Sequence, residues 1–462
     1  MISSKKRKEE NKGGSFSKIS KKMFRTYPLK TAGLPPGISY IIGNEAAERF
    51  SFYGMKTILA IFMTSHLLND VGAPDYMSEG QATVWVHAFV TAVYFTPLLG
   101  SFLADAFWGK YKTIICLSIV YCLGHLSLAF DETRTGLVIG LGLIAVGAGG
   151  IKGCVSAHVG DQFCKENSSL LEKVYGWFYL SINLGAFIST ILTPWLLEYY
   201  GPGVAFGVPG FLMLVATLVF WGGRNDFAHI PARGSEFIRQ TFSRTGLKTI
   251  GNLMVIYLMV AMFWALFDQT ASKWVFQAEQ MDRNFMGVEW LSSQVQAVNP
   301  ALIIILIPLF TYFVYPFINR FFVLTPLRKI GIGFFLVVPS FLIPAWLEYR
   351  IGLGEAPGIG WQLLSYLILT TAEVMISVTC LEFSYTQAPR AMKSLVFGLF
   401  MASVAVGNLF TSLVNLFILN EDGSSKLDGP EYYLFFAGAM LVTAIIFIPI
   451  ARVYPEKSYL HD

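Results

Sequence analysis

Residues 38–66 read ISYIIGNEAAERFSFYGMKTILAIFMTSH, a mostly apolar stretch with charges at Glu45, Glu48, Arg49 and Lys56. A helix that rises 1.5 Å per residue needs about 20 apolar residues to cross a hydrocarbon layer of about 30 Å, and this stretch is longer. A charge at the centre of such a helix costs roughly 2.5–3.5 kcal/mol unless it faces water or a partner. The stretch therefore predicts a membrane helix that turns one face toward a polar interior.

The composition of the whole chain agrees with a membrane protein. Hydrophobic residues make up 54% of the 462 residues and charged residues only 14%, with a mean hydropathy of +0.54. Soluble domains carry about 25% charge, so this chain could not cover its surface in water. A disordered chain and a disulfide scaffold are excluded, and the net charge of +4 is too small for a nucleic-acid partner. The five cysteines form no CxxC or paired framework, and we expect neither a metal nor a cofactor.

Twelve apolar stretches of spanning length fall into two sets of six. The first set covers 38–66, 82–106, 111–130, 136–160, 173–196 and 204–222, and the second covers 249–272, 299–322, 327–348, 360–387, 394–419 and 431–453. The polar and basic stretch 223–248 separates them. We predict an all-α protein with twelve transmembrane helices in two bundles, 38–222 and 249–453, a linker at 223–248 and tails at 1–37 and 454–462. Two similar bundles that meet at the bilayer midplane are the plan of many secondary transporters.

The lysines and arginines predict the orientation of these helices. They gather in the two tails and in alternate connections, whereas the opposite connections hold only Arg134, Lys273, Arg283, Arg350 and Lys426. Because basic loops stay on the cytoplasmic side, both termini are expected there, in a multi-pass protein of the cell membrane surrounded by lipid. The basic tail is followed by no short apolar core with a cleavage site, so we do not interpret it as a signal peptide.

Eight charged residues remain within the predicted helices. They are Glu45, Glu48, Arg49, Lys56, Lys152, Asp268, Glu373 and Glu382. On the first helix the spacing of the charges, together with Phe52, predicts one narrow stripe. Ion pairs that only hold helices together are one interpretation. We favour a shared water-filled cavity, because apolar pairs would hold the helices at lower cost.

Position along the helices predicts which of these residues share a depth. Lys56 and Asp268 come late in ascending helices and His87 comes early in a descending one, so all three are expected in the outer half. Lys152 and Glu373 lie nearer the middle. Depth alone therefore allows two cross-bundle pairs, Lys56 with Asp268 and Lys152 with Glu373. The unperturbed pKa of histidine, about 6.5, makes His87 a candidate for proton exchange, the alternative being a bystander that faces water.

Several blocks of the sequence match a known family. Residues 45–54, EAAERFSFYG, resemble the ExxERFxYYG motif of the proton-dependent oligopeptide transporters, a branch of the major facilitator superfamily. The resemblance continues at GSFLADAFWGKYKTI (100–114), GGIKGCVSAHVGDQF (149–163), GWFYLSINLGAF (176–187), FWALFDQTASKW (263–274) and EVMISVTCLEFSYTQAPRAMKS (373–394). It covers nearly the whole membrane region and is strongest for the mammalian-type peptide carriers. It implies the major facilitator fold, no enzymatic activity, and a compact, microbial carrier.

The resemblance also implies roles for individual residues. The bases that bind the carboxylate of the substrate correspond to Arg49, Lys152 and Lys56. The acid that receives the amino group of the substrate corresponds to Glu373, assisted by Asn183. The positions linked to proton movement correspond to Glu45, Glu48, His87 and Asp268. Two departures matter: Phe52 replaces a motif tyrosine, and Thr311 replaces an acid, which leaves Lys273 without that partner.

The predicted function is proton-coupled import of di- and tripeptides by alternating access. Bases on one bundle and an acid on the other complement a zwitterion, while peptide side chains rest on Tyr53, Tyr94 and Trp264. The partners are then a small peptide, a proton and lipid, and the chain is expected to act as a monomer. Three alternatives stay open: a carrier of nitrate, an amino acid or a peptide-like drug; an intramembrane enzyme; and a non-transporting nutrient sensor. The enzyme lacks support, because the sequence has no HExxH, GxSxG or P-loop pattern.

Overall fold

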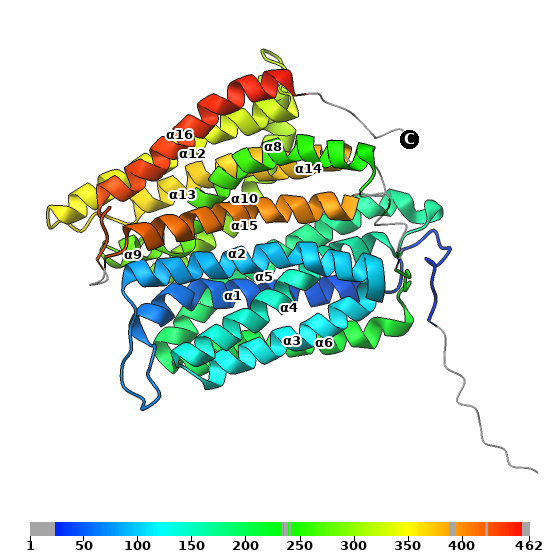
Figure 1. Ribbon diagram of the computed structural model, residues 1–462, viewed down its shortest axis with the longest axis horizontal. Helices are drawn as coiled ribbons and strands as arrows, with labels where there is room; N and C mark the ends of the chain where they lie inside the picture. Colours follow the sequence, from blue (N-terminus) through cyan, green and yellow to red (C-terminus); the bar gives the residue numbers. More distant parts are fainter. Residues whose placement is uncertain are drawn as a thin grey trace, which may run out of the picture.

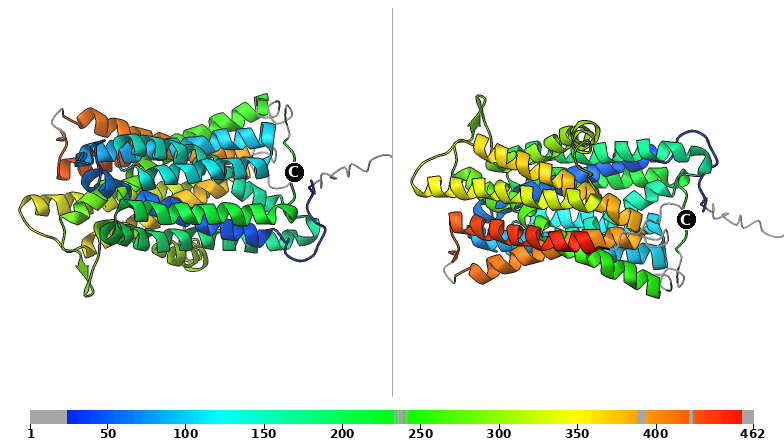
Figure 2. Two further views of the ribbon diagram at one scale, coloured as in Figure 1. Left: turned by 90° about the horizontal axis from the view of Figure 1, so that it is seen from below. Right: turned by 90° about the horizontal axis from the view of Figure 1, so that it is seen from above.

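The structure is a computed structural model that describes residues 24–232, 234, 239, 242–387, 393–420 and 424–454, except for the side chains of Glu172, Thr245, Tyr385, Lys393 and Ser394. These residues are mainly helical and form two bundles that lie side by side (Figures 1 and 2). Each bundle has its own buried apolar cluster. The predicted all-α architecture of two six-helix bundles is confirmed.

The N-terminal bundle consists of six long helices. They are α1 (Ile38–Ser65), α2 (Glu79–Leu103), α3 (Lys110–Phe130), α4 (Arg134–Gly160), α5 (Leu171–Tyr200) and α6 (Pro202–Gly222). A π-helical turn (Ala104–Trp108) extends α2, and 3-10 turns precede α5 (Lys165–Leu170) and follow α6 (Gly223–Asn225). Ser78 caps α2 by accepting a hydrogen bond from the Gln81 amide, while the Gln81 side chain accepts one from the Ser78 amide.

The C-terminal bundle is built from helices that are more often interrupted. They are α8 (Arg244–Phe267), α9 (Lys273–Glu279), α10 (Val298–Leu309), α11 (Tyr315–Ile318), α12 (Pro326–Gly352), α13 (Gly360–Glu373), α14 (Thr379–Gln387), α15 (Lys393–Ile418) and α16 (Pro430–Val453). The 3-10 turn Asp268–Ala271 joins α8 to α9, π turns join α10 to α11 (Phe310–Val314) and α13 to α14 (Val374–Val378), and a 3-10 turn precedes α10 (Ser292–Ala297). The hairpin of β1 (Asn284–Phe285) and β2 (Val288–Glu289) projects from one end (Figure 2).

Eleven helical segments of the described chain are long and apolar enough to cross a membrane. The twelfth predicted span is α1, which has the length but not the composition. Every 18-residue window of α1 contains at least three charged residues. These side chains are buried: Glu45, Glu48, Arg49 and Lys56 are between 1% and 8% exposed. The charges that weaken the apolar signal of α1 therefore face the protein interior, as its sequence predicts.

Glycines allow α4 to pack closely against α2. A Cβ atom on Gly100 of α2 would lie 2.1 Å from the carbonyl oxygen of Gly150 on α4, so no larger residue fits at that crossing. A Cβ atom on Gly149 would lie 1.7 Å from the Thr96 hydroxyl oxygen. The glycine-rich segment of α4 thus brings the backbones together and fixes where the following Lys152 enters the space between the bundles.

Candidate functional site

A cavity of about 1260 Å³ lies between the two bundles. Its wall contains all eight residues that were predicted to bind substrate: Arg49, Tyr53, Lys56, Tyr94, Lys152, Asn183, Trp264 and Glu373. Of the four residues linked to proton movement, Glu45 and Asp268 line the cavity, whereas Glu48 and His87 lie behind its wall. Residues that are far apart in the sequence and come from both bundles therefore share one polar chamber.

The Arg49 guanidinium is paired with two acids on its own helix. Its Nε atom lies 2.7 Å from Glu45 Oε1 and 2.9 Å from Glu48 Oε2. Glu45 and Arg49 are four residues apart and face the same side of α1, which brings the pair together. Glu48 sits at the edge of the predicted stripe and reaches Arg49 from the side away from the cavity. In this conformation both acids neutralise Arg49.

The predicted pair between Lys56 and Asp268 is confirmed. Lys56 Nζ donates to Asp268 Oδ1 at 2.5 Å, and this ion pair connects α1 to the turn between α8 and α9. The second carboxylate oxygen, Oδ2, accepts a 2.7 Å hydrogen bond from Asn408 Nδ2 on α15. Both members of the pair are at most 8% exposed, so water screens their attraction only weakly.

His87 extends this network between the bundles. Its Nδ1 atom lies 2.7 Å from Asn408 Oδ1, and its Nε2 atom lies 3.0 Å from the Ser272 hydroxyl. Because the Asn408 amide nitrogen donates to Asp268 and to the Val404 carbonyl, the Asn408 oxygen must accept, which places a proton on His87 Nδ1. In the neutral ring Nε2 then accepts from Ser272. His87 is fully buried and connects to the Lys56–Asp268 pair instead of facing water.

The predicted pair between Lys152 and Glu373 is wrong. The Lys152 ammonium has no hydrogen-bond partner among the described residues, and it lies over the rings of Phe52 and Tyr94. Glu373 Oε2 instead accepts a 2.6 Å hydrogen bond from Asn299 Nδ2 at the start of α10. Equal depth brought the two charges into one cavity but not into contact. Among the predicted site residues that line the cavity, Lys152 and Glu373 are the two charged residues that have no oppositely charged partner at salt-bridge distance.

The remaining predicted residues lie on the cavity wall with varied partners. Asn183 Nδ2 donates to the Tyr179 carbonyl oxygen at 2.9 Å, so Asn299 and not Asn183 is the amide that contacts Glu373. The Trp264 ring nitrogen has no hydrogen-bond partner among the described residues. Sequence reasoning missed Asn299, Asn408 and Ser272. Neutral amides and hydroxyls cost less in a membrane helix than charges do, so a search for buried charges passes over them.

Lys273 lies outside the cavity, at the end of the molecule that carries the β-hairpin. Its ammonium is 4.9 Å from the centre of the Tyr432 ring, and its electrostatic neighbours are Glu79, Glu348 and Asp428. Glu79 belongs to the other bundle. Thr311, where relatives were expected to hold an acidic partner, is exposed on the π turn between α10 and α11. The acidic environment of Lys273 therefore comes from α2, α12 and the loop before α16.

The cavity is closed at the end that carries the β-hairpin. There, Gln294 Nε2 donates to the Ile191 carbonyl at 2.9 Å and Gln296 Nε2 to the Thr57 carbonyl at 3.2 Å, both across the bundle interface. Toward the opposite end the wall continues through Ile230 and Pro231 of the connection between the bundles to partly exposed residues such as Glu382. The cavity therefore opens at the end where the bundles are connected.

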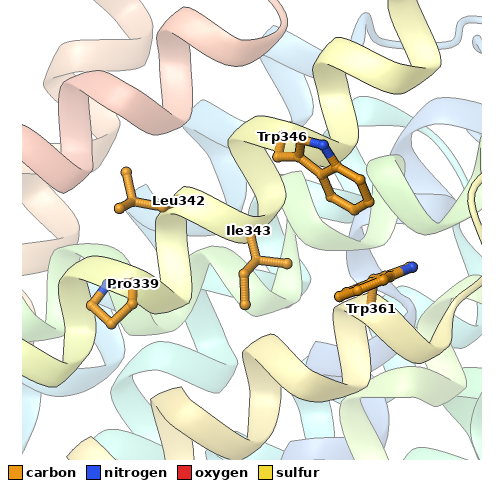
Figure 3. Close-up of a pocket in the computed structure, with 5 residues that line it drawn as sticks. All are labelled: Pro339, Leu342, Ile343, Trp346 and Trp361. Atoms are coloured by element: carbon orange, nitrogen blue, oxygen red, sulfur yellow. The ribbon is translucent and has the colours of Figure 1, made fainter.

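A second hollow, on the outer face of the C-terminal bundle, differs in chemistry. It has a volume of about 330 Å³ and is lined by Pro339, Leu342, Ile343, Trp346 and Trp361 from α12 and α13 (Figure 3). The two indole rings meet at 5.1 Å and 69°. None of these five lining residues is charged, so they offer nothing to the ends of a zwitterion. The charged cavity between the bundles is the candidate functional site.

Two six-helix bundles around a charged cavity that is open at one end define a membrane transporter of the major facilitator type. The comparison with known sequences identifies the branch. The sequence model of the POT family matches residues 111–246 and 242–427, and the chain belongs to this family.

Known relatives support this assignment. Peptide transporter family 1 of Drosophila melanogaster is 36% identical over 371 residues, which cover 69% of this chain and 48% of the relative. Solute carrier family 15 member 2 of Homo sapiens is 35% identical over 397 residues, covering 74% and 53%. The chain thus spans about half the length of these curated relatives.

Solved structures share the fold over nearly their whole length. A crystal structure of an auto-inhibited POT family peptide transporter matches with a TM-score of 0.83 and 34% identity, over 93% of this chain and 99% of that one. The POT family transporter PepTSo matches with a TM-score of 0.82 and 34% identity, over 91% and 99%. The matched relatives and structures are transporters and not enzymes.

Proposed function

We propose that this protein imports di- and tripeptides together with protons by alternating access. The observation that carries the proposal is the pair of opposite charges, Lys152 and Glu373, that face one cavity from different bundles without neutralising each other. A zwitterionic peptide has a carboxylate for Lys152 and an ammonium for Glu373. The names of relatives such as Peptide transporter family 1 support the same cargo.

The fit of both ends explains why small peptides are the substrate class. A peptide between the two groups replaces the lost hydration of each with a charge-assisted hydrogen bond. Asn299 holds the Glu373 carboxylate in place, and the adjoining walls carry Tyr53 and Trp264 for the peptide side chains. Glu373 favours a substrate with an amine and disfavours nitrate.

Proton coupling follows from the acids that occupy the other bases. Glu45 and Glu48 hold Arg49, and Asp268 holds Lys56. A proton on one of these acids releases its base to take the carboxylate of the peptide. His87, connected to Asp268 through Asn408, is the group through which we propose that a proton enters this network from the outer side. Proton binding and peptide binding then favour each other.

The available driving force suits this scheme. One pH unit supplies about 1.4 kcal/mol and 100 mV about 2.3 kcal/mol per charge. Together these give about 3.7 kcal/mol, which corresponds to a several-hundredfold accumulation of peptide for one proton.

The proposed location is the cell membrane, which is the plasma membrane or the inner membrane. In the proposed orientation both termini and the connection 223–248 lie in the cytoplasm. The end closed by Gln294 and Gln296 is then extracellular, and the cavity opens inward. Because each bundle has its own buried core, the bundles can rock as units about the central site. We propose that one chain suffices for this movement.

Uptake by reconstituted protein tests the proposal. In proteoliposomes, labelled Ala-Ala should accumulate only under an inward proton gradient, and unlabelled Ala-Ala should compete better than its N-acetyl or C-amide forms. Glu373→Gln should weaken the competition by unlabelled Ala-Ala. Glu382→Gln, which changes an acid at the open end of the cavity, serves as the matched control. Binding without uptake would support the nutrient sensor instead. Equal competition by the capped peptides would refute recognition of both ends.

A further inference from the structure

The Lys152 ammonium lies between two aromatic rings. Lys152 Nζ is 3.5 Å from the centre of the Phe52 ring on α1 and 4.3 Å from the centre of the Tyr94 ring on α2. Lys152 is 7% exposed and Phe52 is fully buried. A buried ammonium needs compensation for its lost hydration, and the two ring faces provide it through their negative quadrupoles.

This environment differs from that of Arg49 and Lys56, the other two predicted carboxylate-binding bases. Arg49 Nε lies 2.7 Å from a Glu45 oxygen and Lys56 Nζ 2.5 Å from an Asp268 oxygen, so an opposite charge stands beside each of these cations. Ring faces stabilise a cation but add no opposite charge. The Lys152 ammonium makes no hydrogen bond to a described residue and so retains its N–H donors for an anion in the cavity.

The Phe52 ring is held firmly in its position. It packs against Tyr53, with ring centres 5.4 Å apart, and against Phe89 on α2 at 6.4 Å. Phe89 is 5% exposed, so the contact lies within the core of the N-terminal bundle. Because its neighbours restrain the ring, the position of the Lys152 ammonium is fixed before a substrate arrives, which lowers the entropy cost of binding.

We propose that Phe52 and Tyr94 are positioning residues that hold Lys152 as a ready receptor for the carboxylate of the substrate. This inference rests on the proposed function and deepens it, because it assigns affinity for the carboxyl end to two uncharged rings. Tyr94 then acts on Lys152 in addition to lining the cavity.

Leucine at position 52 tests the role of the ring. Binding to purified full-length protein is measured for Ala-Ala and for Ala-Ala amide. Phe52→Leu should weaken Ala-Ala binding about tenfold and leave the weaker binding of the amide unchanged. In uptake assays KM should rise while the maximal rate stays the same, and Phe52→Trp should restore affinity. Phe62→Leu, a fully buried position further along α1 and away from the cavity, is the matched control.

Equal losses for Ala-Ala and its amide, or an equal loss in Phe62→Leu, would overturn the inference by showing a general packing defect. Failure of the unaltered protein to bind Ala-Ala would instead overturn the proposed function. A measurement without peptide tests the ring contact in either case: ¹³C-dimethylated Lys152, assigned by its loss in Lys152→Arg, should show upfield ring-current shifts in NMR spectra. These shifts should decrease in Phe52→Leu, and an unchanged signal would refute the contact.

Discussion

Replacing Asp268 by asparagine should open the end of the cavity that is closed in this structure. Asp268 is the acceptor for Lys56 Nζ at 2.5 Å and for Asn408 Nδ2 at 2.7 Å, so one carboxylate ties α1 and α15 to the turn between α8 and α9. Asparagine keeps the shape of the side chain but removes the negative charge. Lys56 is then left buried without a counter-charge in the closed arrangement.

The size of the effect follows from the burial of the pair. Breaking a buried ion pair by removing one partner costs about 3–5 kcal/mol. Both Lys56 and Asp268 line the wall of the cavity and are not enclosed on every side by protein, so the lower end of this range applies. A loss of about 3 kcal/mol shifts the balance between closed and open conformations roughly 150-fold toward open.

Distances between spin labels measure this shift directly. Val71, in the loop after α1, and Met286, in the β-hairpin, are 86% and 89% exposed and belong to different bundles. With labels at these two positions, Asp268→Asn should populate longer distances than the unaltered protein. Asp75→Asn is the control, because Asp75 pairs with Arg134 within one bundle and on the surface. An unchanged distance distribution in Asp268→Asn would refute the idea that this pair keeps the end closed.

Four further variants or conditions test other parts of the structure. His87→Gln should flatten the pH dependence of peptide uptake, and a profile like that of the unaltered protein would remove His87 from proton coupling. Asn299→Leu should raise the KM for Ala-Ala several-fold, because the Glu373 carboxylate loses its 2.6 Å donor; unchanged kinetics would contradict this. Phe227→Ala should cost about 3 kcal/mol and lower the melting temperature, whereas alanine at the exposed Phe242 should not. Burial lowers the pKa of His229, so its stabilising effect is present above about pH 6.5 and is lost as the pH falls; the acid-induced drop in melting temperature should shrink in His229→Gln.

The sequence predicts the membrane helices well, because few backbone structures are stable within the lipid layer. Apolar length alone identifies eleven spans, and in α1 the spacing of Glu45, Arg49 and Lys56 predicts the face that lines the cavity. Glu48 belongs to the same predicted stripe but lies behind the wall, since its position is at the edge of that stripe. The helical periodicity of α1 predicts the direction in which each side chain points, but the packing of the neighbouring helices decides which of these side chains reach the cavity.

Contacts between helices were predicted less well. Depth gave the Lys56–Asp268 pair correctly and the Lys152–Glu373 pair incorrectly, because depth contains no information on rotation or on neutral competitors. Phe52 competes for Lys152 as a ring face, and Asn299 competes for Glu373 as an amide donor. Neither residue carries a charge, so a method based on the cost of buried charge gives no sign of either.

The distribution of charge in the cavity connects specificity with coupling. Of the three predicted carboxylate-binding bases, two are held by acids, whereas the third lies over aromatic rings and has no acid at salt-bridge distance. Under the proposed function, Lys152 gives a carboxylate its first contact without any proton, whereas Arg49 and Lys56 join only when a proton has displaced them from their acids. Peptide affinity should then have a pH-independent part that depends on Phe52 and a pH-dependent part that depends on Asp268 or Glu48. Phe52→Leu would lower affinity equally at all pH values, while Asp268→Asn would remove much of the pH dependence, so the two variants separate binding from coupling within one site.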